Sequence, residues 1–171
     1  MYLLDSCILL EYLLDQDKAD EVERLLLGAS ETPMAVTEFS LYSIGINMLR
    51  QKLADRFIEF VDDVLVAGRL RLLRLVPRDM ADVAGSARRF GFNFDDAYQY
   101  VAAKKNDLTL VSFDADFDRT DRGRKTPADV LGEPPVARDL PAQPARAQPH
   151  ADRRQAGKPP TKPARRRSRK P

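Results

Sequence analysis

After Met1 the chain opens with Tyr2-Leu3-Leu4-Asp5-Ser6-Cys7-Ile8-Leu9. A short apolar run is followed at once by an acid, and apolar residues then recur at helical spacing. This order predicts a buried β-strand over residues 2–4 and a helix after Asp5. The carboxylate of Asp5 should therefore lie where the strand ends and the helix begins.

The same alternation of short apolar runs and helical segments continues to about residue 113. Strands are also expected over 33–36, 70–76 and 108–113. Helices are expected between them, one ending at Gly28 and the others over about 38–49, 53–65, 78–90 and 95–105. Alternating elements of this kind predict an α/β fold, in which helices cover both faces of a short, mostly parallel central sheet as a three-layer α/β/α sandwich.

Acidic residues follow three of the expected strands. Asp5 follows the first, Glu38 begins the helix after the second, and Asp114 follows the last. The carboxyl ends of parallel strands share one edge of a sheet, and ligands bind in the crevice at that edge. These acids should therefore meet there. Asp95 and Asp96 open a later helix and could add a further carboxylate above the same edge.

A cluster of carboxylates needs a compensating cation, because like charges held close together repel one another. Oxygen donors suit magnesium or manganese better than zinc. Such ions can clamp a phosphodiester and lower the pKa of an attacking water. Taken singly, each acid could equally be a helix cap or a turn residue, so only their joint placement indicates a site. The residues alone predict a carboxylate metal site, which a receiver-like or phosphatase-like domain could also contain.

Composition divides the chain into two parts. Nine of its 12 prolines lie from residue 133 onward, where large apolar residues almost disappear. Such a segment buries too little apolar surface to offset the entropy of ordering it. We therefore expect a folded domain over residues 1–132 and a disordered Pro/Arg-rich basic tail over residues 133–171.

Charge is distributed just as unevenly. Residues 137–171 hold 11 Lys and Arg but 2 Asp and Glu, which leaves 17 basic and 24 acidic residues in the preceding part. An acidic body agrees with a carboxylate site, and a basic tail would favour phosphate backbones.

The amino terminus indicates a cytoplasmic protein. No basic residue precedes its apolar run, and Asp5 and Glu11 interrupt that run, which is unlike a signal peptide. No apolar stretch approaches the roughly 20 residues that a membrane-spanning helix needs. Cys7 is the only cysteine, and its apolar neighbours predict a small core residue.

Four segments resemble, in order, the motifs of PIN-domain nucleases. They are Leu3-Leu4-Asp5-Ser6-Cys7-Ile8-Leu9, Val36-Thr37-Glu38, Phe94-Asp95-Asp96-Ala97-Tyr98 and Leu110-Val111-Ser112-Phe113-Asp114-Ala115-Asp116-Phe117. The resemblance extends from residue 1 to about residue 120, and the short chain is similar to the VapC toxins of toxin–antitoxin pairs. It implies RNA cleavage dependent on Mg²⁺ or Mn²⁺, a cognate antitoxin that blocks the site, and a homodimer formed through helices.

The resemblance also assigns roles to individual residues. The implied metal-binding and catalytic acids are Asp5, Glu38, Asp96 and Asp114. Asp116 is implied as an extra metal-binding carboxylate, and Ser6 and Ser112 as hydroxyls beside the site. Asp95 could share or replace the role of Asp96, although the alanine after Asp96 matches the motif better.

Two other classes of function stay open. A catalytically silent PIN-like domain that binds RNA or a protein partner would keep the fold, but the complete set of acids argues against it. A receiver-like signalling domain would need a lysine at the end of a late strand, and the expected strand over 108–113 has none. The sequence therefore predicts a metal-dependent endoribonuclease whose RNA target it does not specify.

Overall fold

The computed structural model describes residues 1–28 and 32–132. The expected basic tail, residues 133–171, lies outside the described residues. The described strands are β1 (Tyr2–Leu4), β2 (Met34–Thr37), β3 (Leu70–Leu73) and β4 (Thr109–Val111). They form one sheet in the order β3-β2-β1-β4, and every neighbouring pair is parallel. The prediction of a mostly parallel central sheet is confirmed.

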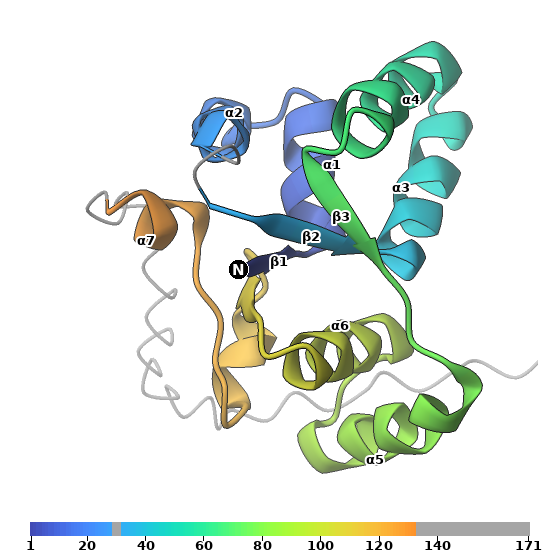
Figure 1. Cartoon of the computed structure of the whole chain (residues 1–171), viewed down its shortest axis with the longest axis vertical. Coiled ribbons are helices and arrows are strands. Elements are labelled where there is room, and N and C mark those ends of the chain that lie inside the picture. The colour runs from blue at the N-terminus through green and yellow to red at the C-terminus, as the bar shows by residue number, and fades with distance from the viewer. Residues whose placement is uncertain (29–31, 133–171) are drawn as a thin grey trace, which may run out of the picture. The chain divides into compact units, whose positions relative to one another are not determined.

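Helices cover both faces of this sheet (Figure 1). One face carries α1 (Ser6–Leu13), α2 (Ala19–Leu27), α3 (Glu38–Arg50) and α4 (Ala54–Phe60), and the other carries α5 (Met80–Phe90) and α6 (Phe94–Lys105). Two 3₁₀ helices, Pro77–Asp79 and Ala115–Arg119, a π-helical segment, Val61–Val66, and a short helix α7 (Pro127–Leu131) complete the described part. The three-layer α/β/α arrangement expected from the sequence is thus confirmed.

Side chains alternate along the strands and build a core on each face of the sheet. Leu3, at the centre of β1, joins the core beneath α5 and α6. The next residue, Leu4, joins the core beneath α1, α2 and α3. Both leucines are fully buried, and burial of such a side chain contributes about 2 kcal/mol. Because successive side chains of a strand point to opposite faces, each strand contributes to both cores and so joins the three layers.

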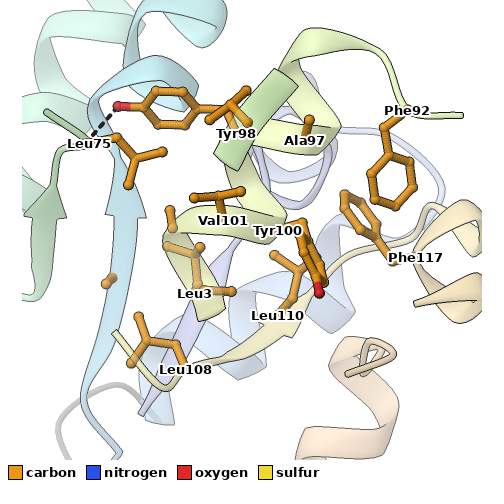
Figure 2. Close-up of a cluster of buried hydrophobic side chains, with 14 residues drawn as sticks. Leu3, Leu75, Phe92, Ala97, Tyr98, Tyr100, Val101, Leu108, Leu110 and Phe117 are labelled. Carbon is orange, nitrogen blue, oxygen red and sulfur yellow. Dashed lines mark hydrogen bonds between the residues drawn. The ribbon is translucent and has the colours of Figure 1, made fainter. Parts of the chain in front are cut away.

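The core beneath α5 and α6 is rich in aromatic rings (Figure 2). Phe92 packs against Phe117 with ring centroids 5.3 Å apart, and Phe90 meets Tyr100 edge-on at 5.1 Å. Leu3 and Leu110 of the sheet belong to the same cluster, and Figure 2 shows Leu110 beside Tyr100. The aromatic contacts tie the segment after β4 to the start of α6, where two of the predicted site regions lie.

Strand β3 is shorter than the sequence predicts, because it ends at Leu73 rather than at residue 76. The amide of Leu75 donates to the Tyr98 hydroxyl at 2.9 Å, as Figure 2 shows, and the amide of Val76 donates to Asp79 Oδ2 at 2.8 Å. Both amides therefore donate to side chains instead of to a neighbouring strand, so the strand ends before them.

Other element boundaries also differ from expectation. Strand β4 spans Thr109–Val111 rather than 108–113. The amide of Leu108 bonds the end of α6, and that of Ser112 bonds the carbonyl of Lys125. The helix expected over 53–65 is an α-helix only as far as Phe60 and continues as a π-helical segment, Val61–Val66. Within the part of the chain that the structure describes, the helices are too short or too polar to cross a membrane.

An ion pair between α6 and the turn before α5 makes stability depend on pH. Lys105 Nζ donates to Asp79 Oδ2 at 2.6 Å, and this bond, together with the amide of Val76, lowers the pKa of Asp79. An acid with a lowered pKa stabilises the fold above its unfolded-state pKa, and this contribution is lost as the pH falls through the folded-state value. We expect Lys105→Met to lower the melting temperature by about 2 °C at neutral pH. The difference should vanish in acid, as measured by circular dichroism melts.

Lys104→Met is the matched control, because it removes the same charge one residue away without touching Asp79. It should retain the loss of stability that follows protonation of Asp79, because Lys104 lowers the pKa of Asp121 and is not among the groups that lower that of Asp79. A loss for Lys105→Met that stays constant from neutral to acid pH would contradict the assignment to Asp79.

Candidate metal centre

The register of the sheet places three polar residues in one row. Leu4 of β1 pairs with Val36 of β2 and with Val111 of β4. The residues that follow these three are Asp5, Thr37 and Ser112. The amide of Asp5 continues the ladder by donating to the carbonyl of Val111 at 3.0 Å. The row lies at the carboxyl edge of the sheet, and of its members only Asp5 is one of the acids expected there.

Asp5 is buried at the centre of this row and is surrounded by donors. The Ser112 hydroxyl donates to its Oδ2 at 2.7 Å, and the Ser6 amide donates to its Oδ1 at 2.6 Å as the cap of α1. Burial raises the pKa of the Asp5 carboxyl, although these hydrogen bonds act to lower it. The structure thus places Ser6 and Ser112 beside this acid, where the motifs implied they would be.

Cys7 has a second role besides its place in the core. It packs against the buried cluster beneath α1–α4, yet its Sγ donates to Asp5 Oδ2 at 3.2 Å. Burial and the nearby charge of Asp5 raise the pKa of the Cys7 thiol to about 12. The group therefore stays a neutral thiol that donates to Asp5. The expectation of a small core residue did not include this contact with Asp5, two positions earlier in the chain.

Two acids after β4, Asp114 and Asp116, interact with groups of the 3₁₀ helix Ala115–Arg119 that follows the strand. Ser112 Oγ accepts from the Asp114 amide at 3.0 Å, and Asp114 Oδ1 accepts from the Asp116 amide at 2.8 Å. Asp116 also pairs with Arg119 at 2.9 Å. One hydroxyl, that of Ser112, therefore links the Asp5 carboxylate to the turn that carries Asp114.

The negative charges of the other acids affect the pKa of Asp96. It is half-buried at the start of α6, whereas Asp95 is exposed. Burial raises the pKa of Asp96 to about 6, and the negative charges of Asp95, Asp114, Asp5 and Asp116 raise it as well. The structure thus brings these acids within electrostatic reach of one another, although they are remote in the sequence.

The Glu38 carboxylate interacts with side chains other than those around Asp5 and Asp114. It is the first residue of α3, and its Oε1 accepts from the Tyr42 hydroxyl at 2.8 Å. Its Oε2 lies 3.9 Å from Arg74 Nε. The carboxylate is therefore shared between a tyrosine one turn along its own helix and an arginine just after β3. Neither partner was predicted from the sequence.

The site fits a hard divalent cation in its chemistry. All its charged donors are carboxylates, and burial together with the negative charges of neighbouring acids raises the pKa of Asp96. Within residues 1–28 and 32–132, however, no three Asp, Glu, His or Cys side chains are arranged as a metal-binding group. Those of Asp5, Glu38, Asp114 and Asp116 are instead directed to the donors named above. Binding an ion would require some of them to turn toward a common point.

Comparison with known protein families bears on this arrangement of acids. The PIN domain matches residues 2–123 of the chain. The chain belongs to this family. The matched residues include all the acids described in this section so far. No curated protein matches the chain in sequence.

Solved structures of other proteins share the PIN fold of this chain. A toxin–antitoxin complex from Klebsiella pneumoniae is 13% identical, with a TM-score of 0.57, over 74% of this chain and 98% of that one. VapBC2 from Rickettsia felis, bound to a DNA fragment from its promoter, is 18% identical, with a TM-score of 0.58, over 72% and 96%. FitAcB from Neisseria gonorrhoeae is 21% identical, with a TM-score of 0.56, over 74% and 98%. At these identities the likeness is one of fold.

Neutralising Asp96 should stabilise the PIN domain in the absence of metal. Its pKa is about 6 in the folded state against 3.8 ordinarily, so its ionised form opposes folding at neutral pH. The cost is absent below the ordinary value, where the group is protonated in both states, and it grows as the pH rises to about 6. We expect Asp96→Asn to raise the melting temperature in EDTA by about 3 °C at pH 7.5, with the gain shrinking toward pH 4.

Asp118→Asn provides the control, since it removes a negative charge nearby but breaks an ion pair. Arg124 Nε lies 3.2 Å from Asp118 Oδ1, and the Asp118 side chain is exposed. This variant should melt at the wild-type temperature or slightly below it. Were Asp96→Asn to melt no higher than the wild type in EDTA, the electrostatic repulsion inferred at Asp96 would be refuted.

Proposed function

We propose that this PIN domain is a metal-dependent endoribonuclease and the toxin of a toxin–antitoxin pair, acting in the cytoplasm. One observation carries the proposal. Burial raises the pKa of Asp96 to about 6, and the negative charges of Asp95, Asp114, Asp5 and Asp116 at the carboxyl edge of a parallel sheet raise it as well. Repelling carboxylates at this edge are costly to the fold, and a bound cation would compensate them.

The residues that would hold Mg²⁺ or Mn²⁺ are Asp5, Glu38, Asp96 and Asp114, with Asp116 as an additional ligand. When bound, the ion supplies positive charge that lowers the pKa of an attacking water and stabilises the leaving oxygen. Ser112 holds both Asp5 and the Asp114 amide, so its hydroxyl orients two of these acids. Hydrolysis would leave 5′-phosphate and 3′-hydroxyl ends, as the resemblance to the family implies.

Two arginines adjoin the acids and support RNA as the substrate. Arg74 lies beside Glu38, and Arg119 pairs with Asp116. Both side chains are more than half exposed. Guanidinium groups bind phosphate oxygens readily, and such contacts position a nucleic acid without selecting its sequence. A phosphodiester backbone lying across the acids would find these cations at either side.

A protein partner is supported by the neighbours and by one exposed apolar stripe. Two of the similar structures are a toxin–antitoxin complex and VapBC2. In this chain Tyr42, Ile46 and Leu49 of α3 are each more than half exposed, and their spacing places them on one face of the helix. We propose that this stripe forms a homodimer interface and that a cognate antitoxin blocks the acidic edge.

A catalytically silent RNA-binding domain is the second candidate. The arrangement of the acids favours it, because the described side chains form no three-ligand group. The two candidates differ in a single assay, which measures RNA binding in EDTA and cleavage after Mn²⁺ is added.

Removal of one carboxylate should abolish cleavage without unfolding the protein. We expect Asp96→Asn and Asp5→Asn to reduce the rate by at least about 100-fold, because charge stabilisation by the metal is worth several kcal/mol. The measurement is cleavage of a fluorescently labelled RNA at matched concentrations of Mg²⁺, followed by analysis of the product ends. EDTA should stop the wild-type reaction.

Asp118→Asn is again the matched control and should cleave at nearly the wild-type rate. Normal cleavage by Asp96→Asn would refute the assignment of the site. Binding of RNA by the wild type, with no cleavage in Mg²⁺ or Mn²⁺, would establish the silent domain instead.

The proposed dimer can be tested by placing a charge in the stripe on α3. Ile46→Asp puts a carboxylate at a position that is 53% exposed, so it should leave the fold intact but separate the subunits. Size-exclusion chromatography with light scattering should give a dimer for the wild type and a monomer for the variant. Ile58→Asp, at a 57% exposed position on α4, is the control and should remain dimeric. A monomeric wild type would rule out the interface.

A further inference from the structure

A buried amide lies in the otherwise apolar middle of α6. Residues 97–103 are all buried, and Gln99 is the amide side chain among them. Only 2% of Gln99 is exposed. Burying an amide is costly unless its polar atoms find partners. The contacts of Gln99 therefore indicate what this residue does.

The Gln99 amide joins α6 to the beginning of α3. Its Nε2 donates to Thr37 Oγ1 at 3.2 Å and also to Ser40 Oγ. Thr37 caps α3, since its Oγ1 accepts from the Ser40 amide at 3.0 Å. The side chains of Thr37 and Ser40 are fully buried. Gln99 thus bonds the cap and the first turn of the helix on which Glu38 is the first residue.

Both helices joined in this way carry a proposed metal ligand close to the contact. Glu38 lies between Thr37 and Ser40 in the sequence, and Asp96 precedes Gln99 by three residues, on a neighbouring part of the same helix. The contact therefore links the segments that carry Glu38 and Asp96. Phe39 adds to the connection by stacking on Tyr98, with ring centroids 5.3 Å apart.

The amide is only partly satisfied. Gln99 Oε1 is buried and has no hydrogen-bond partner in the described part of the chain. An unsatisfied buried carbonyl opposes folding. An apolar side chain of the same length would avoid this cost, and the hydroxyls of Thr37 and Ser40, 3.0 Å apart, could still bond each other. Stability alone therefore does not account for the amide.

We propose that Gln99 is a positioning residue that holds the first turn of α3 against α6 and so sets the separation of the Glu38 and Asp96 carboxylates for metal binding. This role rests on the proposed function, because it assumes that both acids are ligands. Gln99 itself touches neither the metal nor the RNA. It acts through the backbone of two helix ends, as residues that orient metal ligands do in other proteins.

The test is Gln99→Met, which keeps the length and the unbranched shape of the side chain but removes the amide. Binding of Mn²⁺ to the full chain is measured by calorimetry, and stability by urea unfolding in EDTA. We expect Mn²⁺ affinity to fall about 10-fold, while stability in EDTA is unchanged or higher. Ser40→Ala, which removes the accepting hydroxyl, should weaken binding similarly. The two changes combined should cost less than the sum of the separate losses.

Tyr100→Phe is the matched control on the same helix. It removes a buried hydroxyl whose bond to Asp121 measures 2.5 Å and leaves the contact with α3 intact, so Mn²⁺ affinity should not change. Equal Mn²⁺ affinity in the wild type and Gln99→Met would overturn the positioning role.

Other outcomes separate this inference from the proposed function. Wild-type protein that binds Mn²⁺ but cleaves no RNA would overturn the nuclease proposal alone and would leave the result for Gln99 valid. Wild-type protein that binds no Mn²⁺ would overturn both, since the two acids would then have no metal to hold.

Discussion

The parallel register around Leu4 is the constraint on which the rest of the domain depends. Because Leu4 pairs with Val36 and Val111, the next residues along the three strands form one row at the sheet edge. A shift of one residue in either pairing would exchange the two faces of a strand. It would turn Leu4 toward the core beneath α5 and α6 and remove Asp5 from its place beside Ser112. The apolar packing of both cores thus determines where the acid lies.

That position has an energetic cost which the neighbouring donors offset only in part. Asp5 accepts from Ser112, Ser6 and Cys7, and hydrogen bonds to a charged group contribute roughly 1.5–3 kcal/mol each. Its pKa is raised all the same, so the loss of water outweighs the bonds gained. A buried and partly compensated carboxylate does little for stability. Its presence is better explained by a role in binding, as the proposed metal site would require.

The sequence predicts features that depend on local pattern and misses those that depend on distant contacts. Short apolar runs located each of the described strands, and the rule for parallel strand ends predicted that Asp5 and Asp114 lie at one edge. The early end of β3 could not be predicted, because the donor at Leu75 is taken by Tyr98, 23 residues further along. Gln99 was missed for the same reason, since its partners lie about 60 residues away. The one local signal was an amide within a run of buried small and apolar residues.

The amino-terminal ends of three helices supply part of the positive charge that compensates the acids at this edge. α1 begins after Asp5, α3 begins at Glu38, and α6 begins two residues before Asp96. The first turn of each helix carries partial positive charge from its free amides, equivalent to about half an elementary charge. This charge stabilises carboxylates at the helix ends and helps explain how several acids can lie within electrostatic reach of one another in a folded domain. It does not suffice at Asp96, whose pKa remains near 6. A bound cation would offset both the loss of water at Asp96 and the repulsion between the acids, which is the physical reason to look for a cation at this edge.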